Sequence, residues 1–450
     1  MKIYNSMSMK IEEFKPLVEG EATMYVCGPT VYNYPHIGNA RPIVVFDTLK
    51  RTLQALGYKV KMVSNYTDVD DKIINVAKEL GVSEKEVTDK FIKAYNEDRL
   101  SLHAMMPDEA PRVTETMEAI IAFIALLVEK GYAYQVDGDV YFRVGKVKEY
   151  GNLSHQRIDD LVVGARIDEN SKKENPLDFT LWKETSEGIQ WDSPWSKGRP
   201  GWYTECVVMI HDVFQQPLID IHGGGMDLKF PHHENEIAQS QAAYGTSIAR
   251  YWVHNGMINI NGDKMSKSLG NVLWAKDLIK EYGGNVIRWM MLSAHYRAPL
   301  NISEETLQSS KKEYERVANS MKQGYVKLGL SKAQCNGEIL DEFYQPFLDA
   351  MSDDLNTPNA IAAVFEACKK LNTAIRQREL DTVMVASLLR TMDQMMQVMG
   401  IEIPRSEEIP RCCITDEDCV LYETWRAAVK EKNFDQADQY RAQLIEKGIL

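Results

Sequence analysis

The sequence lacks any apolar run long enough to cross a lipid bilayer. Its longest such run, residues 119–128, covers 10 positions, whereas a transmembrane helix needs about 20. The first residues, Met1-Lys2-Ile3-Tyr4, lead into polar sequence, so we predict no secretory signal there. These absences predict a protein that is not inserted in a membrane.

Cysteine is scarce, with 7 residues at irregular spacings among 450. A disulfide framework is typical of short secreted chains with regularly spaced cysteines, so the pattern favours a reducing compartment, the cytoplasm. Long repeats and low-complexity tracts are also missing.

Positive charge is in deficit, because 52 Lys and Arg face 65 Asp and Glu, for a net charge of −13. This argues against nonspecific polyanion binding by the whole surface, but not against a local basic face. Residues 250–327 hold 12 Lys and Arg against 7 Asp and Glu. A solvated helical region explains that count equally well.

The composition is that of a globular protein, and the length predicts two to four domains. Near the N-terminus, apolar strands alternate with amphipathic helices, which predicts an α/β fold with a parallel sheet. Ligands of such sheets bind beyond the carboxyl ends of the strands. The expected strands are residues 22–27 and 59–64, and the expected helices are residues 41–56 and 71–80.

The middle of the chain reads as an insertion between two halves of this sheet. A helix is expected at residues 113–130 and a hairpin at 132–142, followed by polar, turn-rich sequence. The sheet pattern resumes near Gly201, and the sequence from Asn301 onward is helical. We predict divisions at residues 1–112, 113–200, 201–256, 257–310, 311–400 and 401–450.

Residues 221–239 contain the densest group of polar candidates. A glycine run is followed by Asp227, and Pro231 is expected to begin a helix. His232 and Glu236 then lie four positions apart, on one helix face, where they can bind one zinc ion.

Two distant cysteines can complete this half-site. Cys27 ends the first expected strand, and Cys206 ends the run of residues 201–206. Thiolate and imidazole ligands favour zinc over magnesium or calcium. Lone cysteines at strand ends are more often small buried hydrophobes, so the spacing leaves both interpretations open. For a rival cluster, Cys412, Cys413 and Cys419, we expect unliganded thiols, because spaced pairs and nearby histidines are missing.

Two further segments can bind phosphate. Residues 36–39 (H-I-G-N) precede a helix, where an anion is favoured. Residues 261–271 form a glycine-bounded loop that contains Lys264 and Lys267. Each motif is weak alone, since such a histidine is often a helix cap and loop lysines are usually solvated.

Together, H-I-G-N and K-M-S-K-S (residues 264–268) resemble the two signatures of class I aminoacyl-tRNA synthetases. Four other segments resemble cysteinyl-tRNA synthetases, and the resemblance covers nearly the whole chain. They are residues 27–32 (C-G-P-T-V-Y), 67–72 (T-D-V-D-D-K), 199–202 (R-P-G-W) and 230–236 (F-P-H-H-E-N-E).

The resemblance implies a Rossmann-like catalytic domain with a connective insertion, a helical anticodon-binding bundle and a small C-terminal domain. It also implies residue roles. Zinc is held by Cys27, Cys206, His232 and Glu236, and the nucleotide phosphates are met by His36, Asn39, Lys264 and Lys267. The amino acid and adenosine are met by Gly28, Thr30, Thr67, Trp202, His222, Gly224 and Asp227.

The implied reaction ligates cysteine to tRNA(Cys) with ATP, and we expect Mg²⁺ to accompany the phosphates and the protein to be a monomer. Zinc selects the thiolate, which separates cysteine from serine without a second, editing site. Two alternatives remain: a cysteine ligase with a small-amine acceptor, as in mycothiol biosynthesis, and a non-catalytic paralogue that binds RNA or zinc.

The sequence departs from the family pattern at three places. Asn39 stands where class I signatures have histidine, and Tyr203 and Thr204 follow Trp202 where a histidine and an apolar residue are expected. The chain ends at Leu450, without the short aromatic and basic tail of the family, so we expect weakened anticodon discrimination.

Overall fold

The computed structural model describes residues 1–156, 172–265, 271–333, 336–403, 414–447 and 449–450. The chain divides into two compact units. Unit 1 comprises Met1–Glu281 and Tyr296–Ile302, and unit 2 comprises Tyr282–His295 and Ser303–Leu450. Within the described ranges, no helix is both long enough and apolar enough to span a membrane.

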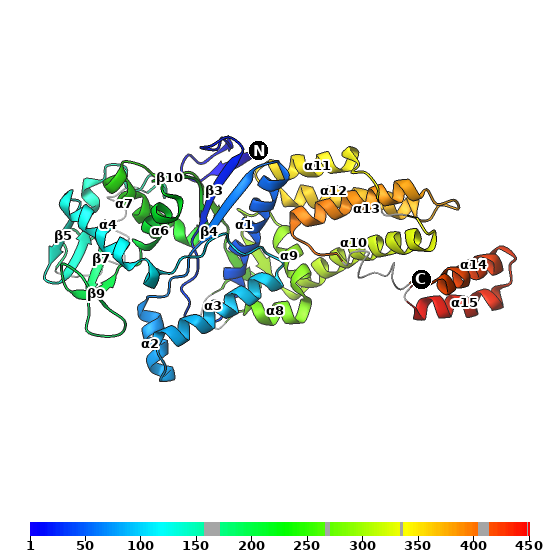
Figure 1. Cartoon of the computed structure of the whole chain (residues 1–450), viewed down its shortest axis with the longest axis horizontal. Helices are drawn as coiled ribbons and strands as arrows, with labels where there is room; N and C mark the ends of the chain where they lie inside the picture. Colours follow the sequence, from blue (N-terminus) through cyan, green and yellow to red (C-terminus); the bar gives the residue numbers. More distant parts are fainter. Residues whose placement is uncertain (157–171, 266–270, 334–335, 404–413, 448) are drawn as a thin grey trace. The chain divides into compact units, whose positions relative to one another are not determined.

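The centre of unit 1 is a four-stranded parallel sheet with the strand order β11-β10-β3-β4 (Figure 1). β3 is followed in the chain by helix α1 and then by β4, the crossover that the alternating pattern predicts. The strands are β3 (Glu21–Val26), β4 (Lys59–Ser64), β10 (Leu218–Gly225) and β11 (Ile248–Asn255).

Helices cover both faces of this sheet, so side chains that alternate along a strand enter different layers. Helix α1 packs on one face, where a Cβ at Gly223 of β10 would lie 2.2 Å from the ring of Phe46. On the other face, Tyr25 joins a core formed largely with α4, α6 and α7. The helices named here are α1 (Ile37–Ala55), α4 (Met117–Glu129), α6 (Glu205–Phe214) and α7 (Glu234–Tyr244).

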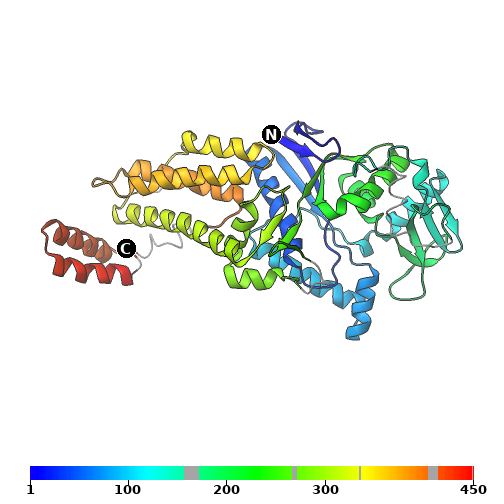
Figure 2. The same ribbon diagram turned by 180° about the vertical axis from the view of Figure 1, so that it is seen from behind.

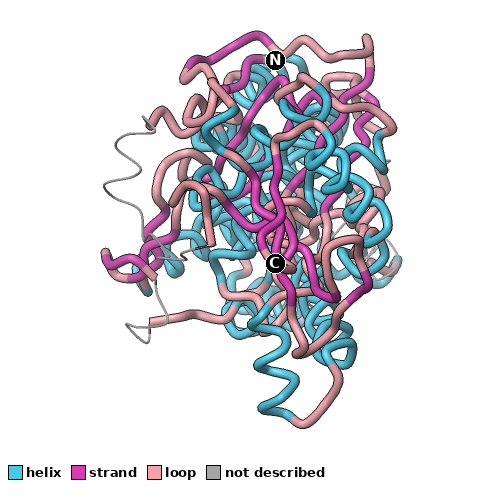
Figure 3. Tube along the Cα trace, turned by 90° about the vertical axis from the view of Figure 1, so that its left-hand side faces the viewer, coloured by secondary structure: helices cyan, strands magenta, loops and turns pink. Residues whose placement is uncertain are grey.

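Between the halves of the parallel sheet, the chain forms a five-stranded antiparallel sheet with the order β5-β6-β7-β9-β8. This is the side of the molecule that faces the viewer in Figure 3, where strands are magenta. Its strands are β5 (Ala133–Val136), β6 (Asp139–Phe142), β7 (Phe179–Glu184), β8 (Trp191–Asp192) and β9 (Lys197–Pro200).

Smaller elements complete unit 1. β1 pairs with β2 in an antiparallel ribbon, and β12 lies between β13 and β14. Their bounds are β1 (Lys2–Asn5), β2 (Lys10–Glu13), β12 (Ile258–Ile260), β13 (Asp263–Lys264) and β14 (Leu300–Ile302), and the remaining helices are α2 (Asp71–Leu80), α3 (Glu84–Ser101) and α8 (Ala275–Tyr282).

All regular secondary structure described in unit 2 is helical, as the sequence after Asn301 predicts (Figure 2). The long α10 packs with α9, α12 and α13, and α14 pairs with α15. The bounds are α9 (Gly284–Leu292), α10 (Glu304–Leu330), α11 (Asp341–Ser352), α12 (Thr357–Ala374), α13 (Thr382–Met399), α14 (Asp416–Lys430) and α15 (Phe434–Glu446).

Two local expectations are wrong, and a third is confirmed. Helix α1 begins at Ile37 rather than near Arg41, because the Asn39 side chain accepts a hydrogen bond from the backbone N–H of His36 at 3.1 Å. The helix expected at Pro231 is present, because helical backbone follows the kink at Phe230 and continues from His233 into α7.

The second wrong expectation concerns Cys206, which lies in the first turn of helix α6 and not at a strand end. The aromatic residues before it favour a strand, but residues 201–204 form a turn closed by Thr204 N–H to the Gly201 carbonyl, at 3.3 Å. The predicted domain divisions inside the two units stay predictions.

Candidate functional site

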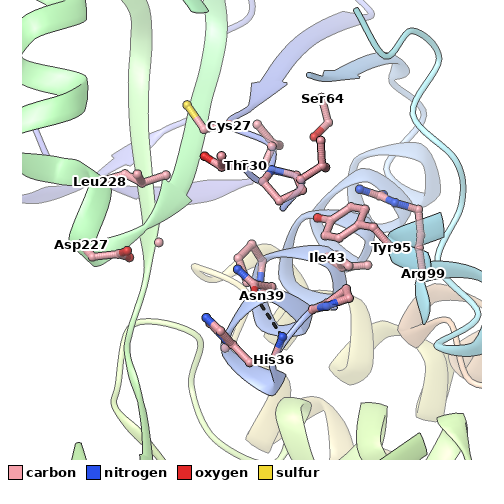
Figure 4. Close-up of a pocket in the computed structure, with 18 of the residues that line it drawn as sticks. Cys27, Thr30, His36, Asn39, Ile43, Ser64, Tyr95, Arg99, Asp227 and Leu228 are labelled. Atoms are coloured by element: carbon pink, nitrogen blue, oxygen red, sulfur yellow. Dashed lines mark hydrogen bonds between the residues drawn. The ribbon is translucent and has the colours of Figure 1, made fainter. Parts of the chain in front are cut away.

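A cavity of about 390 Å³ lies at the carboxyl ends of β3 and β10, the edge where parallel sheets bind ligands (Figure 4). Seven of the predicted site residues line it. They are Cys27, Gly28, Thr30, His36, Asn39, Trp202 and Asp227. The structure therefore brings these predicted residues together around one cavity, which is also lined by residues that the sequence did not single out, such as Ser64, Tyr95 and Trp274.

The four predicted metal ligands meet beside Cys27, the one of the four that lines the cavity, with their ligand atoms all within 4.8 Å of one another. Cys27 Sγ lies 3.6 Å from Cys206 Sγ and 3.6 Å from Glu236 Oε1. His232 Nε2 lies 3.7 Å from Cys206 Sγ and 2.9 Å from Glu236 Oε1. Four segments far apart in the sequence thus form one compact group.

Strand alternation and helix position explain this convergence. Cys27 follows β3 and lies two positions after Tyr25, so it points to the same face of the sheet, toward α6 and α7. Cys206 lies in the first turn of α6, and Glu236 lies in the first turn of α7.

The spacing of the ligand atoms fits a tetrahedral zinc ion. With Zn–S about 2.3 Å and Zn–N about 2.0 Å, tetrahedral geometry puts two sulfurs about 3.8 Å apart and sulfur and nitrogen about 3.5 Å apart. The distances of 3.6 Å between Cys27 and Cys206 and 3.7 Å between Cys206 and His232 agree with these values. Soft thiolates with imidazole are also the donors that zinc prefers.

A second group, Cys27, His222, His233 and Glu236, shares two members with the first. His222 Nε2 lies 2.7 Å from Glu236 Oε2, and His233 Nε2 lies 3.3 Å from Cys27 Sγ. If the first group held a metal ion, these contacts would make His222 and His233 outer partners that orient its ligands. The sequence analysis assigned no role to His233. The only sequence feature that could have indicated one is its position next to the predicted ligand His232.

Burial and mutual contacts shift the pKa values of the group strongly. The hydrogen bond from the Cys27 thiol lowers the pKa of Cys206 to about 6, with His232 acting in the same direction. Burial raises the pKa of Cys27. Although burial opposes it, the charges of His222 and His232 hold the pKa of Glu236 well below its usual range. Cys206 is therefore the first of the two thiols to ionise.

The first signature lies at the other end of the cavity and is held by the chain just after the second signature. His36 caps α1, and the Asn39 N–H donates to the His36 carbonyl at 2.8 Å. The Ile37 N–H donates to the Leu273 carbonyl at 2.8 Å, and His36 forms a bridge with Trp274. Lys267 lies outside the described residues, as does the side chain of Lys264.

The remaining predicted residues divide between the cavity wall and its support. Gly28 allows close backbone approach, because a Cβ there would lie 1.6 Å from the Asn65 carbonyl oxygen. The ring of Trp202 lies 4.5 Å from that of His232, centroid to centroid.

Besides the metal-ligand candidates Cys206, His232 and Glu236, three predicted residues do not line the cavity: Thr67, His222 and Gly224. The Thr67 hydroxyl donates to Glu205 Oε2 at 2.6 Å. Thr67 therefore contacts the residue that precedes Cys206 and not the cavity itself. His222 is fully buried against Glu236, and a Cβ at Gly224 would lie 2.9 Å from Leu228 Cδ1. Asp227, by contrast, faces the cavity.

Comparison with known proteins matches two separate parts of the chain to two different domain families. Residues 13–312 match the model of the tRNA synthetases class I (C) catalytic domain, and residues 346–403 match the DALR domain. Solved structures with the same fold include methionyl-tRNA synthetase of Mycobacterium tuberculosis bound by methionyl-adenylate, with a TM-score of 0.63 at 13% identity over 86% of this chain and 92% of that one. A leucyl-tRNA synthetase (LeuRS) of Agrobacterium radiobacter, in a ternary complex with tRNA, has a TM-score of 0.60 at 14% identity over 86% and 85%.

Fold, cavity and catalytic-domain match define this chain as a class I aminoacyl-tRNA synthetase. Full-length relatives narrow the class. The cysteine–tRNA ligase of Halalkalibacterium halodurans is 48% identical over 100% of this chain and 97% of its own length. The cysteine–tRNA ligase of Geobacillus sp. is 47% identical, over 100% of this chain and 97% of its own length. The chain belongs to the cysteine–tRNA ligase family.

Proposed function

We propose that this protein joins L-cysteine to tRNA(Cys) in two steps at the described cavity. The cysteine carboxylate attacks the α-phosphate of ATP and releases pyrophosphate, and the 2′-hydroxyl of the terminal tRNA adenosine then takes the cysteinyl group from the adenylate. The observation that carries the proposal is the group of Cys27, Cys206, His232 and Glu236 at one end of a cavity that has His36 and Asn39 at the other.

Amino-acid selection belongs to the buried end. Cys27, Cys206, His232 and Glu236 would hold one zinc ion, which supplies a soft Lewis acid that prefers a thiolate to a hydroxyl. Trp202 forms the wall beside His232, and Thr30 lines the cavity next to Cys27. Thr67, through Glu205, and His222, through Glu236, hold this end in position.

ATP activation belongs to the opposite end. Negative charge grows on the phosphate oxygens as the carboxylate attacks, and donors fixed in advance stabilise it. His36 and Asn39 occupy the first turn of α1, where free backbone N–H groups also favour an anion. Lys264 and Lys267 are assigned to the same phosphates, and Gly224 and Asp227 to the adenosine. Mg²⁺ would accompany the phosphates and neutralise part of their charge.

The helical part of the chain is assigned to tRNA. The DALR match at residues 346–403 lies in α11–α13 of unit 2, and we assign this bundle to the anticodon stem. The small-amine ligase and the non-catalytic paralogue are not favoured, because relatives that match over the whole chain are cysteine–tRNA ligases. A monomeric state remains our prediction.

Two assays on the full chain test the proposal. Cysteine-dependent exchange of pyrophosphate into ATP should occur, and serine should not replace cysteine. A tRNA(Cys) transcript should then accept cysteine. Absence of exchange would refute cysteine activation, whereas exchange without charging of tRNA would point to a different acceptor.

A further inference from the structure

The cavity extends beyond the residues assigned to cysteine and ATP. In the view of Figure 4, Tyr95 and Arg99 lie together on the side of Thr30 away from Cys27 and Asp227, with Ser64 above them and Ile43 below. Tyr95 and Arg99 lie on α3, Ser64 ends β4, and Ile43 lies on α1. We call this part of the cavity the Arg99 pocket.

Arg99 is a buried cation whose guanidinium lies over the Tyr95 ring, 5.6 Å from its centroid, and has no carboxylate partner among the described residues. Its residue is 4% exposed, and its Nη1 donates to the Met105 carbonyl at 3.2 Å. Its Nε is buried and has no hydrogen-bond partner among the described residues, and the guanidinium forms no ion pair with them. An uncompensated buried charge is costly, so an anion beside Arg99 is favoured.

The nearby acids do not neutralise Arg99. Asp47, which lines the same cavity, accepts hydrogen bonds from Arg51 Nε and the Met105 N–H, each at 2.8 Å. Asp98 precedes Arg99 in the chain, and its Oδ2 is buried with no partner in the described structure, so the two adjacent charges do not meet.

The surroundings of Arg99 combine polar donors with apolar walls. Ser64 and Tyr95 are 5% and 6% exposed and offer hydroxyl groups to the cavity. Burial raises the pKa of Tyr95, so its hydroxyl stays protonated and can donate. The walls between them are apolar, formed by Ile43, Phe46 and Met62.

We infer that the Arg99 pocket is a second binding site, which takes a small carboxylate with a short apolar body. The planar fork of arginine matches the two oxygens of a carboxylate, the hydroxyl groups of Ser64 and Tyr95 can complete its hydrogen bonds, and the apolar walls fit the rest of the ligand. The inference does not depend on the proposed reaction, because none of these side chains is assigned to cysteine, ATP or tRNA.

The site can be tested with isobutyrate and benzoate as probes of the full-length protein. Ligand-observed NMR should detect binding of at least one probe while saturating cysteine and a non-hydrolysable ATP analogue are present. Displacement of the probes by either substrate would place them in the catalytic part of the cavity and overturn the inference. Binding of inorganic phosphate in place of both carboxylates would also overturn it, as would no binding, which would mean that water alone solvates Arg99.

Variants locate the probe. Arg99→Met should weaken carboxylate binding at least tenfold, whereas Lys93→Met, an exposed change on the same helix, should leave it unchanged. Ser64→Leu, which fills the pocket and leaves the Arg99 residue itself unchanged, should also abolish binding. This variant tests the inference if Arg99→Met does not fold. Unchanged affinity in either folded pocket variant overturns the inference.

Discussion

The two ends of the cavity are built in opposite ways. The group at Cys27, Cys206, His232 and Glu236 draws on segments separated by up to 209 positions, and three of its four residues are buried. The phosphate end, at His36 and Asn39, comes from one helix turn and is half-buried. Recognition of a single soft atom needs ligands at fixed distances, which burial and multiple contacts provide, whereas phosphate stabilisation needs donors that a large ligand can reach.

The largest expected effect comes from removing a ligand of the buried group. Cys206→Ser replaces a thiolate by a hydroxyl that stays protonated, so bound zinc should be lost and cysteine activation should fall by well over about a hundredfold. Metal analysis and pyrophosphate exchange measure both effects. The matched control is Cys419→Ser, a buried thiol on α14 of unit 2 that should change neither. Full activity of a metal-free Cys206→Ser protein would refute the zinc–thiolate assignment.

A change at the phosphate end should separate activation from metal binding. Asn39→Asp retains an oxygen that accepts from the His36 N–H, so the helix cap survives, but it removes a donor and adds repulsion toward phosphate. Removing one such donor costs roughly a hundredfold or more in rate. Pyrophosphate exchange should fall accordingly while the metal content stays at the wild-type level. Loss of metal in this variant would mean that the two ends are not independent.

An outer partner should give an intermediate effect. His222→Asn removes the 2.7 Å contact to Glu236 Oε2, which orients that carboxylate. We expect zinc affinity to drop about 10- to 100-fold, the usual range for such partners, with activity restored by added zinc. Competition with a chelator measures the affinity. If His222→Asn removes metal as completely as Cys206→Ser, His222 would be a ligand and the second group of four would be the correct one.

The smallest effect concerns two buried acids of unit 1, Glu236 in the metal-ligand group and Asp98 on α3. Glu236 is held ionised by His222 and His232, whereas burial raises the pKa of Asp98 from 3.8 to about 6. A raised folded-state pKa contributes stability that is present below about pH 4 and is lost as the pH rises through about 6. Asp98→Asn should therefore raise the melting temperature at pH 8 by ~1–2 °C relative to wild type, and by less at pH 4.5. Equal shifts at both pH values would contradict this assignment.

Local sequence patterns predicted the bounds of a helix or strand correctly where the signals lie within that one segment. β4 and α2 begin and end at the predicted residues, because an apolar run and an Asp70 cap are local signals. The strand end at Cys206 was mispredicted, because the backbone there turns and places Cys206 in the first turn of α6, beside Cys27 and His232. Local propensity yields to such tertiary requirements most often at functional sites.

The sequence by itself determined the fold class, the family and the four candidate metal ligands, because residue types at signature positions are readable one segment at a time. It could not decide whether lone cysteines at residues 27 and 206 were ligands or small buried side chains. Only the tertiary structure resolved their spacing, since strand order and helix packing set the 3.6 Å between their sulfurs. It alone also brought the buried Arg99 to the cavity, because the burial of a charge depends on segments that are distant in the sequence.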